Sequence, residues 1–145
     1  MKVHLERASF EHVQTFAREL GAEDECEAQA AGYLSASLGC FAMLERAVEA
    51  WALLEASGRV LGMLAVQPGG RVWVHTAPAF KQAGLGALRL VRQLFAELLE
   101  RHPRLEVEVD PRNDALVRLA DWVGFRHAEF TSIDGRPFHH AVLRA

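Results

Sequence analysis

One short segment of the chain combines a positive charge with several small residues, in the pattern Lys-x-x-Gly-x-Gly. It runs from Lys81 to Ala87 and leads into a long segment of helical periodicity that extends to Arg101. The first turn of a helix exposes backbone N–H groups that have no partner within the helix, and the helix dipole adds partial positive charge there. Glycine and alanine leave room for a ligand to approach these groups. The segment is therefore a candidate binding site for a phosphate or another anion.

The segment does not fit the two best-known glycine loops that bind phosphate. A P-loop requires Gly, four residues and then Gly-Lys-Ser/Thr, and the chain does not contain that pattern. A dinucleotide-binding fingerprint requires a third glycine, but the position that should hold it is Arg89. Both kinds of nucleotide-binding module are therefore disfavoured. The remaining alternative is that Gly84 and Gly86 only allow a helix to pack closely against a sheet.

Titratable side chains lie in the segments on either side of this helix. His75 precedes the glycine turn, and an imidazole titrates near neutral pH, as a general base must. Glu106, Glu108 and Asp110 alternate with apolar residues, so a strand would place all three carboxylates on one face. That face could attract a cationic amine, with Glu108 as a base that acts through water, or it could be only a solvated surface. His75 could likewise be structural.

No metal site is expected from the sequence. Cys26 and Cys40 lack Cys-x-x-Cys spacing, and we interpret them as small buried hydrophobic residues. His139 and His140 are adjacent, and adjacent residues of a strand point to opposite faces. These two residues and His127 are therefore not expected to share a metal ion.

The bulk composition is that of one globular domain covering residues 1–145. Half of the residues are apolar and 24% are charged, and the net charge is −3. Binding to nucleic acid requires a basic face, so nucleic acid is not expected as a partner. The chain has no apolar segment of the roughly 20 residues needed to cross a membrane, and its first residues contain no apolar signal core. We therefore expect an intracellular, cytoplasmic protein without a membrane partner.

Periodicity and turn residues predict an alternation of strands and helices along the whole chain. Alternating or continuous apolar residues between turn signals predict strands at 3–8, 50–56, 59–68, 71–76, 105–110, 125–133 and 137–143. Apolar residues at helical spacing predict helices at 10–20, 24–38, 84–101 and 114–123, and further helical turns at 40–48. Ser9 and Asn113 are the expected N-caps, and Gly39 is expected to break the second helix.

Two local patterns within this order of elements resemble the signatures of the GNAT superfamily of N-acetyltransferases. The first is a strand, Pro78, the Lys-x-x-Gly-x-Gly turn and a long helix, with Lys81 where the family usually has Arg or Gln. The second is Asn113, followed twelve residues later by Phe125 in a Gly-Phe pair. The predicted order β, α, α, β, β, β, α, β, α, β, β is also that of GNAT proteins. The resemblance covers the chain from about Trp51 to its end.

The resemblance implies an α/β fold, the GNAT or acyl-CoA N-acyltransferase fold. Its sheet is mixed, mostly antiparallel, flanked by helices, and splayed between the fourth and fifth strands. In GNAT proteins the pantetheine arm of an acyl-CoA lies in this gap, bonded to the backbone of the fourth strand, and the pyrophosphate lies on the N-terminus of the long helix. The implied cofactor is thus acetyl-CoA or another acyl-CoA. The implied cofactor-binding residues are Val74, Thr76, Lys81, Gln82, Ala83, Gly84, Gly86, Ala87 and Asn113.

The resemblance further implies acyl transfer to an amine, carried by a small molecule or a peptide, with His75 and Glu108 as the candidate catalytic residues. One position departs from the family, which commonly has a tyrosine as general acid seven residues after the asparagine. That position is Ala120, and the only tyrosine of the chain, Tyr33, lies in the early helical region and is not expected to replace it. Catalysis is still allowed, because a thiolate is a tolerable leaving group that water can protonate.

A narrower resemblance gives the alternative function. Residues 104–138 resemble a GNAT-related group among small proteins of short-tailed phages, through a strand ending in Val-Asp and the later Arg-Asn, Gly-Phe and Gly-x-x-Phe patterns. The alternative is therefore a non-catalytic GNAT-like binding or assembly protein. Ala120 favours it, whereas Lys81, Gly84 and Gly86 favour retained cofactor binding. Because edge strands of such sheets often pair, a homodimer is a further expectation.

Overall fold

The computed structural model describes residues 2–20, 25, 26, 28, 29, 32–133 and 135–145. The strands are β1 (Val3–Arg7), β2 (Glu49–Glu55), β3 (Val60–Gln67), β4 (Arg71–Thr76), β5 (Arg104–Val109), β6 (Arg126–Ile133) and β7 (Arg136–Arg144). The helices are α1 (Phe10–Ala17), α3 (Ala36–Arg46), α4 (Gly84–Arg101), α5 (Asp114–Val123) and the short 3₁₀ helix η1 (Pro78–Gln82). None of the described helices is long and apolar enough to span a membrane.

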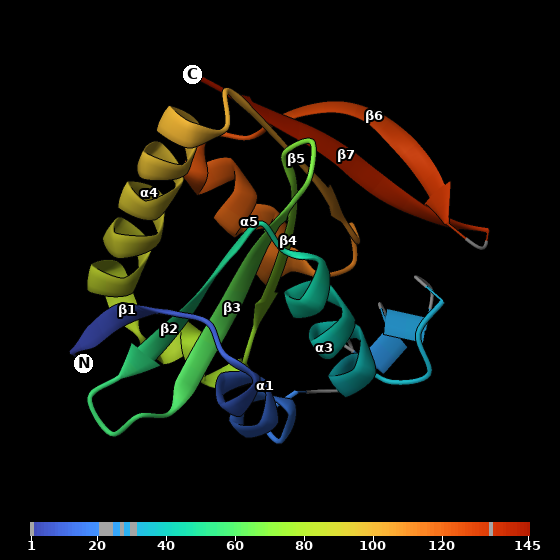
Figure 1. The fold of residues 1–145 in the computed structure, drawn as a ribbon. Helices are drawn as coiled ribbons and strands as arrows, with labels where there is room; N and C mark the ends of the chain where they lie inside the picture. Colours follow the sequence, from blue (N-terminus) through green and yellow to red (C-terminus); the bar gives the residue numbers. More distant parts are fainter. Residues whose placement is uncertain (1, 21–24, 27, 30–31, 134) are drawn as a thin grey trace.

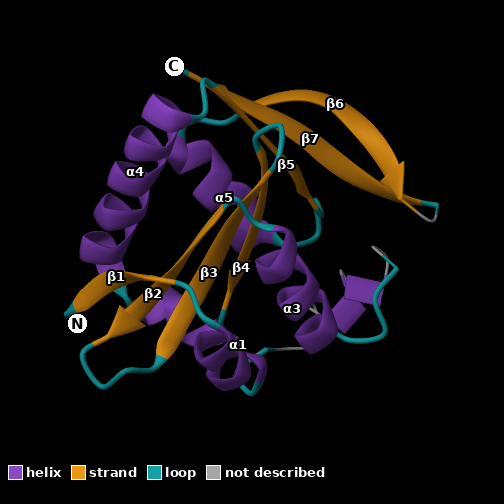
Figure 2. Ribbon diagram, in the orientation of Figure 1, coloured by secondary structure: helices purple, strands orange, loops and turns teal. Residues whose placement is uncertain are grey.

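The strands form one mixed sheet in the order β1-β2-β3-β4-β5-β7-β6. All neighbouring strands are antiparallel except β4 and β5, which are parallel. Helices α4 and α5 cover one face of the sheet, and α1 and α3 lie on the other (Figures 1 and 2). The predicted fold class, with its mostly antiparallel sheet flanked by helices, is confirmed.

Local capping signals in the sequence fix where two of the helices begin. The Ser9 hydroxyl accepts a hydrogen bond from the His12 backbone N–H, and the His12 ring accepts one from the Ser9 N–H, which together form a capping box at α1. The Asn113 side chain accepts the Leu116 N–H at α5. Both predicted N-caps are thus confirmed, because each depends only on residues within one turn.

The predicted helix at 24–38 is wrong in its boundaries. Part of it lies outside the described residues, but Gly32 has a φ of +93°, which no right-handed helix contains. Ser35 then caps a new helix by accepting the Leu38 N–H. This helix, α3, continues through Gly39, which does not break it. A glycine inside an apolar pattern can either end a helix or lie within it. The sequence-based prediction therefore placed the break at Gly39, whereas the chain leaves helical geometry at Gly32.

The two faces of the sheet differ in character because side chains alternate along each strand. The face under α4 and α5 carries the larger hydrophobic core, to which β5 contributes Leu105, Val107 and Val109. The opposite face carries a smaller core under α1 and α3. The remaining residues of β5, which are Arg104, Glu106 and Glu108, point to that second face, so its part nearest β5 is polar.

Strands β4 and β5 are paired at one end only. Their single registered pair is Arg71 with Glu106, and the Glu106 N–H donates to the Gly70 carbonyl over 2.9 Å. Gly70 has a φ of +85°, and a Cβ atom added to it would lie 2.1 Å from the Arg104 carbonyl oxygen. The turn before β4 therefore approaches β5 as closely as only glycine permits. Beyond this contact the two strands separate, as the predicted splay requires.

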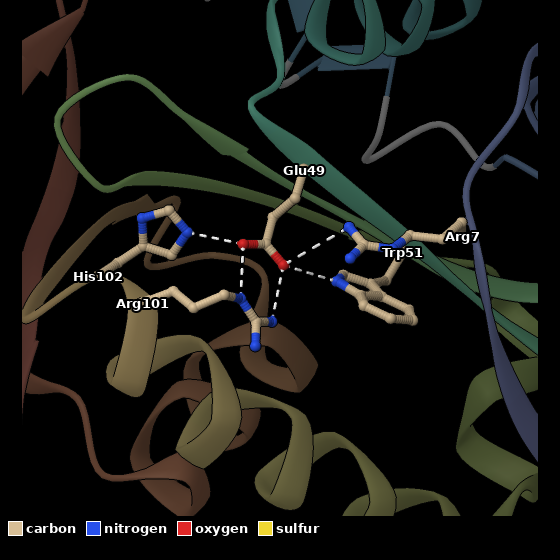
Figure 3. Close-up of polar contacts among 5 residues, drawn as sticks. All are labelled: Arg7, Glu49, Trp51, Arg101 and His102. Carbon is tan, nitrogen blue, oxygen red and sulfur yellow. Dashed lines mark hydrogen bonds and ion pairs between the residues drawn. The ribbon is translucent and has the colours of Figure 1, made fainter.

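A carboxylate on β2 holds the C-terminal end of α4 against the sheet (Figure 3). The Glu49 carboxylate accepts two hydrogen bonds from the Arg101 guanidinium, at 2.8 and 3.0 Å. It also contacts the His102 ring at 2.8 Å and accepts the Trp51 indole N–H at 3.0 Å. These bonds, led by the one from Arg101, lower the pKa of Glu49 to about 2 despite the opposing effect of burial. The cluster links β2 to the end of the longest helix.

We predict that Glu49 makes the stability of the fold depend on pH below 4.5. Its pKa is lower in the folded chain than the ordinary 4.5, so its contribution is complete above pH 4.5 and is lost as the pH falls toward 2. Glu49→Gln should lower the free energy of unfolding by about 2 to 3 kcal/mol at pH 7, because a charged acceptor of several hydrogen bonds is removed. Urea unfolding at pH 7 and pH 3 measures both effects.

Glu19 supplies the matched control for this experiment. Its carboxylate also accepts two hydrogen bonds from one arginine, Arg59, but Glu19 is more exposed than Glu49, and among the described residues it has no further partner like His102. Glu19→Gln should cost less than about 1 kcal/mol, as exposed pairs do. Equal losses in Glu19→Gln and Glu49→Gln would contradict the assignment of Glu49 as the stronger link.

The contact at Gly70 gives a second prediction with an internal control. Gly69 and Gly70 have nearly the same backbone, with φ of +89° and +85°, but a Cβ at Gly69 would meet nothing within 4 Å. Gly69→Ala should therefore cost only the backbone strain, about 1 kcal/mol. Gly70→Ala adds the clash with Arg104 and should lower the free energy of unfolding by at least about 2 kcal/mol more, measured by urea unfolding. Equal effects would show that β4 and β5 do not depend on this contact.

Candidate active site

The backbone of β4 faces an unpaired region on its β5 side. The Ala77 N–H donates to the Leu61 carbonyl of β3 over 2.8 Å, and hydrogen bonding in an antiparallel pair alternates by residue. The odd-numbered residues of β4 therefore bond to β3, and the even-numbered ones face β5. Within the described residues no β5 residue is in register with Val74 or Thr76. Their amide and carbonyl groups are thus not paired with β5.

Helix α4 begins at the far end of this gap, and no side chain caps its first turn in the described structure. This distinguishes it from α1, α3 and α5, each of which is capped by a side chain. Its first turn contains no acidic residue, and Lys81, just before it, is exposed. The positive end of the longest helix is therefore open to an anion.

Gly84 and Gly86 differ in what their lack of a side chain permits. Gly84 has a φ of +76°, which allows the chain to pass from η1 into α4. Gly86 lies within α4 in ordinary helical geometry, and a Cβ added to either residue would meet nothing within 4 Å. The alternative that these glycines serve close packing against the sheet is therefore wrong. At Gly86 the absence of a side chain leaves free space outside the helix, where a ligand could lie.

The other implied cofactor-binding residues surround the same turn. Gln82 is exposed, whereas Ala83 and Ala87 are buried and support the turn from the core side. Asn113 is more distant in sequence and uses its side-chain oxygen to cap α5, which begins directly after the turn that follows β5.

A cavity of about 310 Å³ lies beside the gap, on the face of the sheet that α3 covers. Alternation along the strands directs the side chains of Arg71, Trp73 and His75 from β4 to this face. One face of α3, formed by Ala36, Gly39, Met43 and Arg46, closes the other side. The remaining lining residues are Ala28, Tyr33, Gln67, Val72, Val74, Glu106, Val107, Glu108, Leu116, Phe138 and His140.

Both candidate catalytic residues line this cavity. His75 is 8% exposed, and its ring lies 4.6 Å from that of Trp73, centroid to centroid. The Glu108 carboxylate lies 3.7 Å from the Arg71 guanidinium, and His140 is its neighbour on β7. The structure therefore brings together a histidine from β4 and a carboxylate from β5, on opposite sides of the gap.

The three carboxylates of β5 have different environments. Glu106 also lines the cavity and forms an ion pair with Arg104. Asp110 is 4% exposed and does not line the cavity. Its carboxylate accepts hydrogen bonds from the Arg112 backbone N–H and guanidinium at 2.8 to 3.1 Å. The simple interpretation as a solvated acidic face is thus wrong for Asp110, which stabilises the turn after β5.

Several lining residues were not identified from the sequence. Tyr33 lines the cavity although it was not expected at the site, and its ring lies against α3 where a Cβ at Gly39 would approach it to 3.4 Å. Arg46 and His140 also line it. Alternation along 71–76 could have indicated Arg71 and Trp73, but no local signal could have indicated His140. Ala120, the position of the usual tyrosine, does not line the cavity.

Within the described part of the chain no three ligand-type side chains are close enough to hold a metal ion. His127 and His139 do approach each other, with ring centroids 4.5 Å apart, and Phe130 lies against both. His140 points instead into the cavity. The expected separation of His139 and His140 onto opposite faces is therefore confirmed.

Solved structures of other proteins share this arrangement. A protein from Bordetella pertussis assigned to the GNAT-family acetyltransferases aligns over 100% of both chains, with a TM-score of 0.71 and 22% identity. The chain has the GNAT fold. The ribosomal-protein-S18-alanine N-acetyltransferase from Escherichia coli aligns over 99% of this chain and 94% of its own, with a TM-score of 0.66 and 19% identity. An aminoglycoside acetyltransferase in complex with coenzyme A aligns over 99% of this chain and 95% of its own, with a TM-score of 0.66 and 15% identity.

The similarity is one of structure rather than sequence. No protein-family model and no curated protein matches the sequence. The GNAT fold predicted from the glycine turn and the Asn113 pattern is confirmed by these structures. They give no support to the alternative of a phage-type assembly protein.

Proposed function

We propose that this protein binds acetyl-CoA or another acyl-CoA and transfers the acyl group to an amine. The observation that carries the proposal is the first turn of α4, where Gly86 leaves free space beside uncapped backbone N–H groups. A glycine within a helix costs roughly 0.5 to 1 kcal/mol relative to alanine, and here no protein atom requires it. A phosphate group that approaches the helix end supplies the reason.

The remaining residues fit such a ligand. Lys81 would add a positive charge beside the pyrophosphate, and Val74 and Thr76 would bond to the pantetheine amides from the β5 side of β4. One of the GNAT structures that this chain resembles contains coenzyme A. An acyl-CoA would supply an activated thioester to the cavity at the other end of the gap.

The chain's own residues would then orient and deprotonate the acceptor. Glu108 and His75 line the cavity from opposite strands, so either can accept the proton that the amine must lose, Glu108 directly or through water. A backbone N–H of β4 that faces the gap can polarise the thioester carbonyl. Because no tyrosine stands at position 120, the proton for the departing thiolate would come from water. The acceptor would be a small-molecule amine or a peptide amine.

Substitution at Gly86 tests the cofactor site. Gly86→Glu places a carboxylate in the free space outside the helix, where it would occupy and repel the phosphate position. We expect the affinity for CoA to fall at least a hundredfold, measured by calorimetry, while the melting temperature changes little because the added side chain meets no protein atom. Gly86→Ala is the control and should keep binding while raising the free energy of unfolding by about 0.5 to 1 kcal/mol. The absence of CoA binding by the parent protein would refute the proposal.

Substitution of the two candidate bases tests the chemistry. At least one of the variants Glu108→Gln and His75→Gln should lower kcat about a hundredfold or more, as the loss of a general base does, and both should leave the affinity for acetyl-CoA unchanged. Release of free thiol from acetyl-CoA over a panel of amines measures the rate. Glu106→Gln is the control, since Glu106 lies on the same strand and lines the same cavity. If turnover is unaffected in both His75→Gln and Glu108→Gln, these catalytic assignments are wrong.

A further inference from the structure

The cavity is lined by charged side chains of both signs rather than by carboxylates alone. Glu106 and Glu108 come from β5, Arg71 comes from β4, and Arg46 comes from the last turn of α3. A site for a plain amine or a polyamine needs only carboxylates. The two arginines indicate that the ligand also carries negative charge.

The spacing of Arg71 and Glu108 favours a ligand that carries one positive and one negative group close together. Their charged groups lie 3.7 Å apart, and both side chains reach the cavity. In an amine whose adjacent carbon carries a carboxylate, the nitrogen lies about 3 Å from a carboxylate oxygen, as bond lengths require. Such a ligand can place its amine at Glu108 and its carboxylate at Arg71 at the same time.

Arg46 supplies an additional positive charge on the opposite wall. It is exposed, and within the described structure it has no carboxylate within ion-pair distance. By contrast, Glu106 is paired with Arg104 and Glu108 with Arg71. Arg46 is therefore the lining arginine without a carboxylate partner among the described residues, and a carboxylate of the ligand would neutralise its charge.

The shape of the gap places these arginines at the acceptor end. The cofactor turn follows the C-terminal end of β4 at Thr76, and the strands meet at Arg71. An acyl group that enters from the α4 side therefore points toward the end that holds Arg71 and Arg46. The cavity volume of about 310 Å³ is at the lower end of ligand sites, which suits a small acceptor.

We infer that the acceptor is an α-amino acid, whose carboxylate binds Arg71 and Arg46 while its amine lies against Glu108. This inference rests on the proposed function for its chemistry, since it names the acceptor of the same site. The amine loses a proton to Glu108 and its nitrogen forms a bond to the thioester carbonyl carbon. The carbon–sulfur bond breaks, the thiolate takes a proton from water, and no oxidant or reductant is needed.

The test compares L-amino acids with their α-amides. The amide keeps the side chain and the amine but lacks the negative charge. With acetyl-CoA as donor, kcat/KM should be at least tenfold higher for the acids, mainly through KM. Arg46→Gln should reduce that ratio at least tenfold, and Arg46→Lys should restore part of it. Arg126→Gln, which alters an exposed arginine on β6 outside the cavity, is the matched control and should leave the ratio unchanged.

A binding experiment decides the inference independently of catalysis. The same acids and amides are titrated into the free protein, and NMR chemical shifts report binding. Binding of at least one acid, with its amide at least tenfold weaker and the difference lost in Arg46→Gln, supports the inference. Equal affinity for acids and amides, or no binding of any acid, overturns it. A protein that binds amino acids but no CoA would contradict the proposed function, and only the inferred binding of an α-amino acid in the cavity would stand.

Discussion

The close approach of Gly70 to β5 governs where this fold can hold a ligand. A carbonyl of β5 occupies the position that a side chain at Gly70 would need, and the two parallel strands share a single registered pair at that point. Parallel neighbours normally continue their hydrogen bonding along the strand. Here the bonding stops after one pair, so the backbone groups of Val74 and Thr76 stay available. The gap therefore results from the single point of pairing between β4 and β5.

This gap has different surroundings at its two ends and on its two faces. One end opens toward the uncapped start of α4, which attracts anions through backbone groups alone. The other end closes at Arg71, where charged side chains of both signs reach a cavity under α3. The apolar residues of β5 join the main core on the opposite face, so the same alternation that stabilises the sheet also makes the cavity polar.

Local signals in the sequence predicted much of this arrangement. Ser9, Asn113 and the alternation at 105–110 depend on neighbouring residues, and each predicted element is confirmed. The glycine turn predicts an anion site from seven residues alone, and the start of α4 has no side-chain cap in the described structure. Other features depend on contacts that no local pattern encodes. His140 reaches Glu108 only through the pairing of β5 with β7, and Glu49 finds Arg101 and His102 more than fifty positions away.

The Glu49 cluster and the glycine turn lie at opposite ends of helix α4. Helix α4 has 18 residues, so its length is about 27 Å. A rotation of about five degrees around the clamped end would displace the first turn by roughly 2 Å, close to the difference between a hydrogen bond and none. The position of the amides at the start of this helix is therefore set partly by a carboxylate at its other end.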